Sequence, residues 1–139
     1  MKRVELTPGE TSLLDAARQL AARLDVAVIL VLTDRPYDFQ GIASELMQVR
    51  LVVASGDEEV QMAASQDDVD FVPLIHEPQT RQVQLNQALL EAIADDLLQT
   101  GSRTIAVYPG YERDNLDSLS IISLSEHLAK LTARDLQRL

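Results

Sequence analysis

The chain has 139 residues and a mass of 15.4 kDa, which suits one domain with its own core. A hydrophobic fraction of 46% excludes a disordered tail, and the absence of cysteine excludes disulfides, thiolate metal sites and cysteine nucleophiles. The net charge is −10, and residues 26–100 alone hold thirteen acids against three bases, so we do not expect direct binding to nucleic acid.

The first predicted helix follows the turn Thr7-Pro8-Gly9-Glu10, with Thr11 or Ser12 as its cap. Between Leu13 and Leu24 apolar residues recur at spacings of three and four, which predicts one buried stripe. Residues 26–32 then run apolar without alternation. This pattern is typical of a strand covered on both faces, so we expect a central parallel strand here.

A second, shorter helix is predicted around residues 42–47, where the inward positions include Met47. Residues 51–54 follow as a second buried strand, and residues 57–65 as a short acidic helix. A third strand is predicted over residues 69–75. Since proline cannot donate a ladder hydrogen bond, this strand either ends at Pro73 or lies at an edge of the sheet.

Residues 80–98 give the longest helical pattern, and Gly101 stands where the helix would stop. The fourth and fifth strands are predicted at 104–108 and 118–124, and a last helix at 132–139. In the fifth strand serine alternates with apolar residues, which indicates an antiparallel edge. The pattern as a whole predicts a single three-layer α/β domain over residues 1–139, with a mostly parallel five-stranded sheet and helices on both faces.

Polar residues and not a hydrophobic run follow Met1-Lys2-Arg3, so we expect no signal peptide, and the longest apolar run is about a third of a membrane span. We therefore expect a cytoplasmic protein without a membrane partner.

No motif for catalysis is visible. His76 and His127 lie 51 positions apart, and the five glycines are too scattered for a dinucleotide fingerprint or a phosphate loop. The pairs Asp67-Asp68 and Asp95-Asp96 are interpreted as solvated surface or, if they converge in the fold, as a Mg²⁺ site. We favour the first interpretation and expect no catalytic residue, metal or cofactor in this domain.

Three places are candidates for ligand binding. His76 follows the third predicted strand, at an end where parallel sheets bind ligands, although a hydrogen-bonded loop histidine has the same pattern. Thr80 and Arg81 begin the long helix, where an anion could bind. The polar loop 110–118 is either a plain connector or part of a site. Its candidate residues are Gly110, Asn115, Asp117 and Ser118.

The last two segments also carry a family resemblance. Arg81 and the run Gln84-Leu85-Asn86-Gln87-Ala88-Leu89 are followed by residues 97–105, by Gly110 and by Leu116-Asp117-Ser118-Leu119. This succession resembles the amino-terminal domain of archaeal-type diadenylate cyclases, which is similar in turn to the carboxy-terminal α/β domain of pyruvate kinase. The resemblance covers residues 13–124.

The resemblance implies a pyruvate kinase C-terminal-like fold and a non-catalytic role in regulation or oligomerisation. In that family a catalytic domain of the DNA-integrity-scanning type follows and condenses two ATP into cyclic di-AMP. Its Asp-Gly-Ala and Arg-His motifs do not occur here. We therefore expect an accessory domain that forms homo-oligomers and precedes a covalently linked catalytic domain, where ATP and a divalent metal would act.

Two other interpretations stay open. The chain could be a stand-alone or sensing protein of this fold that binds an anionic effector near Thr80, Arg81 and the loop 110–118. The related kinase domain holds a phosphate sugar with a Ser/Thr-rich loop, whereas Thr33-Asp34-Arg35-Pro36 stands at that place here. The other interpretation is an enzyme assembled from His76 and scattered carboxylates.

Overall fold

The computed structural model describes residues 1–75, 77 and 79–126. Five strands form one sheet in the order β3-β2-β1-β4-β5, in which only β5 is antiparallel to its neighbour. The predicted α/β class, the mixed sheet and the antiparallel last strand are confirmed. The elements are α1 (Pro8–Leu24), β1 (Val28–Leu32), α2 (Phe39–Leu46), β2 (Arg50–Ser55), α3 (Glu58–Gln66), β3 (Asp70–Pro73), α4 (Arg81–Ala94), β4 (Arg103–Tyr108) and β5 (Ser118–Ser123).

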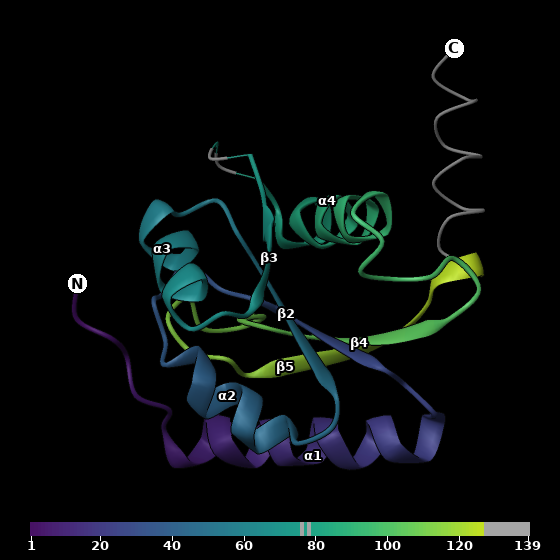
Figure 1. Ribbon diagram of the computed structural model, residues 1–139, viewed down its shortest axis with the longest axis horizontal. Helices are drawn as coiled ribbons and strands as arrows, with labels where there is room; N and C mark the ends of the chain where they lie inside the picture. Colours follow the sequence, from purple (N-terminus) through teal and green to yellow (C-terminus); the bar gives the residue numbers. More distant parts are fainter. Residues whose placement is uncertain (76, 78, 127–139) are drawn as a thin grey trace.

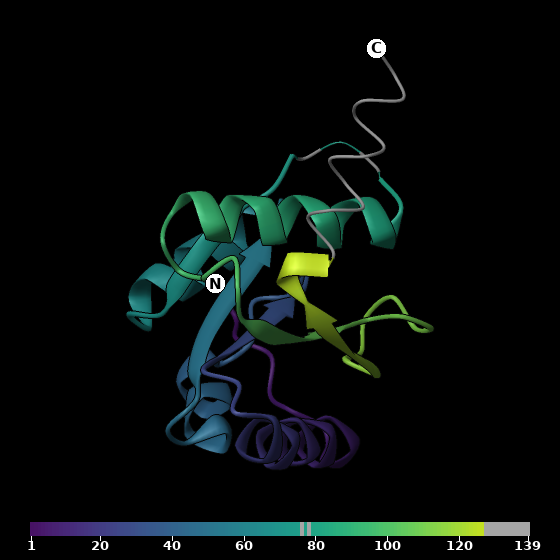
Figure 2. The same ribbon diagram turned by 90° about the vertical axis from the view of Figure 1, so that its right-hand side faces the viewer.

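The chain reverses its direction across the sheet at β1. From β1 it steps through α2 and α3 to β2 and β3, and it then returns through α4 to place β4 on the other side of β1. Because crossovers between parallel strands are right-handed, steps in opposite directions place their helices on opposite faces. Figures 1 and 2 accordingly show α1 and α2 below the sheet and α4 above it.

Each face of the sheet buries an apolar cluster. Ile29 and Val31 of β1 join the cluster under α1, α2 and α3, whereas Leu30 and Leu32 join the cluster under α4. All five residues of β1 are buried. The strand therefore needs apolar side chains at every position, which explains why its sequence does not alternate.

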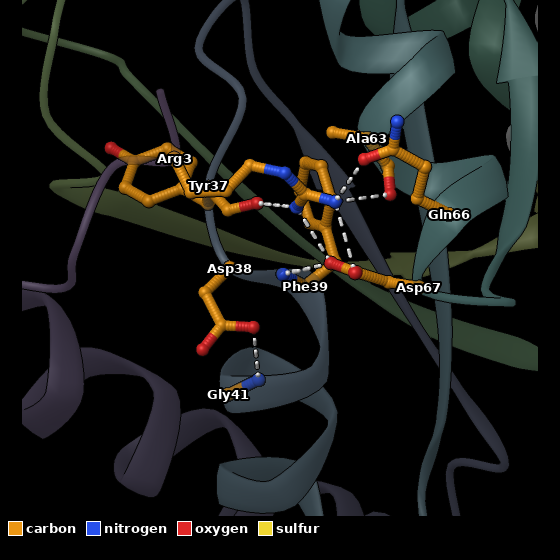
Figure 3. Close-up of polar contacts among 8 residues, drawn as sticks. All are labelled: Arg3, Tyr37, Asp38, Phe39, Gly41, Ala63, Gln66 and Asp67. Atoms are coloured by element: carbon orange, nitrogen blue, oxygen red, sulfur yellow. Dashed lines mark hydrogen bonds and ion pairs between the residues drawn. The ribbon is translucent and has the colours of Figure 1, made fainter. Parts of the chain in front are cut away.

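Residues 1–7 form an N-terminal arm, which Arg3 holds against the rest of the fold by hydrogen bonds and an ion pair (Figure 3). Val4 pairs with Tyr37 as a short bridge, in which the Val4 N–H donates to the carbonyl of Pro36 at 2.9 Å. Arg3 donates from Nη1 to the carbonyl of Tyr37 at 2.8 Å and forms an ion pair with Asp67 just after α3. No periodic pattern in the sequence predicts this arm.

Helix α1 begins earlier than the sequence analysis predicts, since its cap is Thr7 and not Thr11 or Ser12. The Thr7 hydroxyl accepts the N–H of Glu10 at 3.1 Å, and the Glu10 carboxylate accepts the N–H of Thr7 at 3.0 Å. This is a capping box. Pro8 fits at the first helical position because that position needs no N–H donor.

Helix α4 ends at Ala94 and not near residue 98, so α1, with 17 residues, is longer than α4, with 14. Asp96 has a φ of 60°, and the N–H of Leu97 donates to the carbonyl of Ala92 at 2.8 Å. This Schellman turn stops the helix before Gly101 is reached. Aspartate tolerates the left-handed conformation that glycine usually supplies.

Met47 is a further correction to the predicted inward positions. It lies just outside α2, with a φ of 56°, and its side chain is exposed. The predicted helix at 132–139 lies outside the described residues. Within the described ranges, no helix has the length and apolar character needed to cross a bilayer.

Candidate ligand-binding cleft

A cleft of about 670 Å³ lies at the carboxyl-terminal ends of β1, β2 and β4 and beside the start of α4. This is where the strand order reverses between β1 and β4, the place where open α/β sheets bind ligands. The volume is that of a small-molecule site. The lining residues are Asp34, Gly56, Asp57, Ile75, Glu77, Gln79, Arg81, Gln84, Pro109, Gly110, Tyr111, Glu112 and Arg113.

The structure brings two of the predicted site residues, Arg81 and Gly110, to the cleft itself. Arg81 is the first residue of α4, and its Nη1 donates to Oε1 of Gln84 at 2.7 Å. Thr80 caps the same helix: its hydroxyl accepts the N–H of Val83 at 3.2 Å. The Thr80 hydroxyl therefore stabilises the helix start that positions Arg81.

Asp117 is bonded within its own loop. Its carboxylate accepts the N–H groups of Gly110 at 2.7 Å, Tyr111 at 3.1 Å and Glu112 at 2.7 Å, and the hydroxyl of Ser118 at 2.9 Å. Desolvation opposes ionisation, but these donors outweigh it and lower the pKa of Asp117 to about 2. The carboxylate thus fills a nest of backbone donors and fixes the shape of the loop that walls the cleft.

The remaining predicted residues lie apart from the cleft lining or outside the described chain. Ser118 approaches Gly110 so closely that a Cβ on the glycine would stand 2.3 Å from the serine Oγ. Asn115 is half-buried and is not among the lining residues. His76 lies outside the described residues.

A buried carboxylate holds the loop from below. Glu10 is fully buried, and its Oε2 accepts the Tyr37 hydroxyl at 2.5 Å and the N–H of Leu116 at 3.0 Å. Desolvation raises the pKa of Glu10, but the hydrogen bonds from Tyr37, Leu116 and Thr7 outweigh it, so the net shift is downward. The start of α1 is therefore joined directly to the loop that borders the cleft.

Opposite charges share the cleft. Four carboxylates line it, those of Asp34, Asp57, Glu77 and Glu112, together with the guanidinium groups of Arg81 and Arg113. Within the described part of the chain, neither arginine forms an ion pair. Two cations therefore stay available for a ligand in a strongly acidic protein.

The loop after β1 departs from a phosphate-binding loop in structure as well as in sequence. The Thr33 hydroxyl accepts the N–H of Arg35 at 3.1 Å and is buried. The next residue, Asp34, brings a carboxylate to the cleft. This side of the cleft accepts hydrogen bonds and repels anions.

The carboxylate pairs that could have formed a metal site serve other purposes. Asp67 pairs with Arg3, and Asp68 and Asp96 take the left-handed position after α3 and α4. Among the described residues, no three histidine, aspartate or glutamate side chains are grouped to hold a metal ion. The Mg²⁺ alternative gains no support from this geometry.

Several cleft residues were missed by sequence reasoning. For Asp34 and Asp57 the only available signal was a position within a few residues of a strand end, whereas Tyr111 and Arg113 lie in the predicted polar loop 110–118 but were not named as its candidate residues. Tyr111 is 98% exposed. The Oε1 of Gln79 is buried, and the described residues offer it no hydrogen-bond partner.

Comparisons with known proteins agree on the fold. A family model described as "Probable sensor domain DacZ_P" matches residues 9–132, and DacZ is a diadenylate cyclase. Among curated proteins, none matches the chain. Two crystal structures of pyruvate kinase from Cryptosporidium parvum superpose with TM-scores of 0.63 and 0.65, at 15% identity. They cover 85% of this chain but only 23% of the kinase, so the likeness to the kinase C-terminal domain is one of fold alone.

Proposed function

This chain belongs to the family of the probable sensor domain DacZ_P, and we propose that it is the non-catalytic regulatory domain of a diadenylate cyclase that binds an effector in the cleft. The observation that carries the proposal is the place of the cleft. It lies at the reversal of strand order and is walled by a loop tied to Glu10 in the core. An effector there would act on a loop with direct links to the rest of the domain.

The composition of the cleft favours binding over catalysis. Among the described residues its lining includes no serine, threonine, cysteine or histidine, so no hydroxyl or thiol nucleophile of these types is paired there with a histidine base. In this proposal a covalently linked catalytic domain uses ATP and a divalent metal to make cyclic di-AMP in the cytoplasm. This domain changes the rate of that reaction.

The charges of the cleft narrow the class of effector. Four carboxylates against two arginines disfavour a bisphosphate, because the second anionic group would face carboxylates. Arg81 and Arg113 fit one anionic group, and the carboxylates fit N–H or O–H donors. We infer a small molecule with a single anionic group and several hydrogen-bond donors.

A thermal-shift titration tests the binding. Compounds with one carboxylate or phosphate and several amino or hydroxyl groups should raise the melting temperature of the chain more than bisphosphates do. Arg81→Ala should weaken binding of the best compound about tenfold or more. Arg23→Ala is the matched control, because this exposed arginine lies in the last turn of α1, next to the opposite end of the strands. Equal loss in both variants, or no shift by any compound, would contradict the cleft proposal.

An activity assay tests the regulatory assignment. The 139-residue chain, incubated with ATP and Mg²⁺ or Mn²⁺, should form no cyclic di-AMP. Formation of cyclic di-AMP by the purified chain would overturn the non-catalytic assignment.

A further inference from the structure

The outer edge of β5 lacks the usual protection of an edge strand. The six residues Ser118–Ser123 contain no charge, no proline and no glycine, and no described segment pairs with their outer side. Figures 1 and 2 show β5 at the rim of the sheet. Ile121 is 50% exposed. Such an edge is a template for pairing with another strand.

The opposite edge of the same sheet is protected. Strand β3 has only four residues, begins with Asp70 and ends with Pro73, and Asp70 forms an ion pair with Arg50. A short strand with a charge and a proline resists pairing with another chain. The edge at β3 therefore carries features that prevent pairing with another chain, whereas the edge at β5 lacks them.

The backbone pattern of β5 fixes which groups point outward. The N–H of Leu124 donates to the carbonyl of Ser102 at 3.0 Å, which continues the register of β4 and β5. In an antiparallel pair alternate residues direct their N–H and C=O toward the partner, so the residues between them direct theirs away. The residues with outward groups are therefore Leu119, Ile121 and Ser123.

Charge favours a second copy of this chain as the partner on this edge. Two copies with a net charge of −10 repel each other, so they meet most easily where charge is lowest. Residues 118–125 form an exposed or half-exposed stretch, apart from buried Leu124, without any charge. The strand can also pair with itself, since an antiparallel arrangement about a two-fold axis is self-complementary.

We propose that two copies of this chain associate through their β5 strands, antiparallel about a two-fold axis at Ile121. Each Ile121 then lies opposite the same residue of the second copy, and Leu119 lies opposite Ser123. The three pairs supply about six backbone hydrogen bonds and form one ten-stranded sheet. The paired residues 119–123 carry no charge, so no like charges face each other within the paired strands.

The dimer extends the proposed function, and only its biological role rests on that function. A catalytic domain that joins two ATP benefits when two copies are held together. Five paired residues in each chain, 119–123, bury less surface than the roughly 1,200 Å² of a stable interface. We therefore expect a weak, concentration-dependent dimer of the 139-residue chain, which linked domains would strengthen.

Sedimentation equilibrium over a range of concentrations tests the interface. Ile121→Lys and Ile121→Glu should each raise the dimer dissociation constant about tenfold or more, since like charges face each other on the axis. An equimolar mixture of the two variants should dimerise again, because lysine then faces glutamate. Met62→Lys is the matched control, an exposed methionine on α3 with the same change of charge, and should dimerise like the parent chain.

Restored dimerisation in the mixture would also demonstrate that both variants fold. A chain that stays monomeric at all concentrations, or a dimer that neither Ile121 variant weakens, would overturn the proposal. The thermal shift by a cleft effector, measured in the same Ile121 variants, should be unchanged. The two measurements thereby distinguish failure of the dimerisation proposal from failure of the effector-binding proposal.

Discussion

Arg3 and Asp67, 64 positions apart in the sequence, are joined by two hydrogen bonds, from Nη1 to Oδ2 at 2.7 Å and from Nη2 to Oδ1 at 3.0 Å (Figure 3). The same guanidinium donates to the carbonyls of Tyr37 and Ala63. One side chain thus joins the N-terminal arm, the segment after β1 and the end of α3.

Replacing Arg3 should therefore loosen three segments at once. We expect Arg3→Ala to lower the free energy of unfolding by about 2–3 kcal/mol, because several acceptors lose a charged donor. Arg3→Lys should recover only part of this, since an ammonium group cannot bind a carboxylate with a planar fork. Urea denaturation measures both values. Arg23→Ala, on the exposed end of α1, should change stability by less than about 0.5 kcal/mol, and an equal loss there would contradict this account.

Substitution of Glu10 should lower the stability of the domain as much as substitution of an apolar core residue. Glu10→Ala leaves the Tyr37 hydroxyl and the Leu116 N–H buried without an acceptor, which should cost about 3 kcal/mol. Tyr37→Phe removes one donor and should cost less. Glu91→Ala, on the exposed side of α4, is the control and should be nearly neutral. A Glu10→Ala variant as stable as the control would refute the role of the buried carboxylate.

The loop 110–117 should weaken in acid in a defined interval. The pKa of Asp117 is about 2 in the folded chain, against a reference value of 3.8. A lowered pKa contributes stability above the unfolded value, and this contribution is lost as the pH falls from about 4 to about 2. Asp117→Asn lacks it. The difference in unfolding free energy between parent and variant should therefore shrink over this interval, and a constant difference from pH 6 to pH 2 would disprove the assignment.

Gly110 should not tolerate a side chain. A Cβ there would stand 2.9 Å from the Cβ of Ser118, which no rotation of the serine hydroxyl relieves. We expect Gly110→Ala to cost about 1–3 kcal/mol in thermal unfolding. Adding Ser118→Gly should recover part of that loss. Gly101→Ala is the control, because a Cβ at that position meets nothing within 4 Å; a penalty at Gly101 equal to that at Gly110 would argue against steric crowding.

Much of the fold follows from local patterns in the sequence. The unbroken apolar run before Thr33 predicted a strand covered on both faces, and the alternation of serine with apolar residues predicted the antiparallel edge. The ends of the helices were harder to predict from the sequence. A left-handed residue after a helix is usually glycine, so Gly101 was the predicted stop. Asp96 takes this conformation instead, and α4 therefore ends earlier than predicted.

Residues of the candidate site were predicted only where the sequence indicated a helix start or a polar loop, as at Arg81 and Gly110. That Asp117 binds its own loop, or that Asp34 reaches the same cleft, depends on backbone geometry that no spacing encodes. The sequence by itself determined the order and type of the elements, because periodicity reports which side of each element is buried. The tertiary structure alone decided the cleft and the contact of Glu10 with Leu116 across 106 positions, because both depend on where the chain reverses across the sheet.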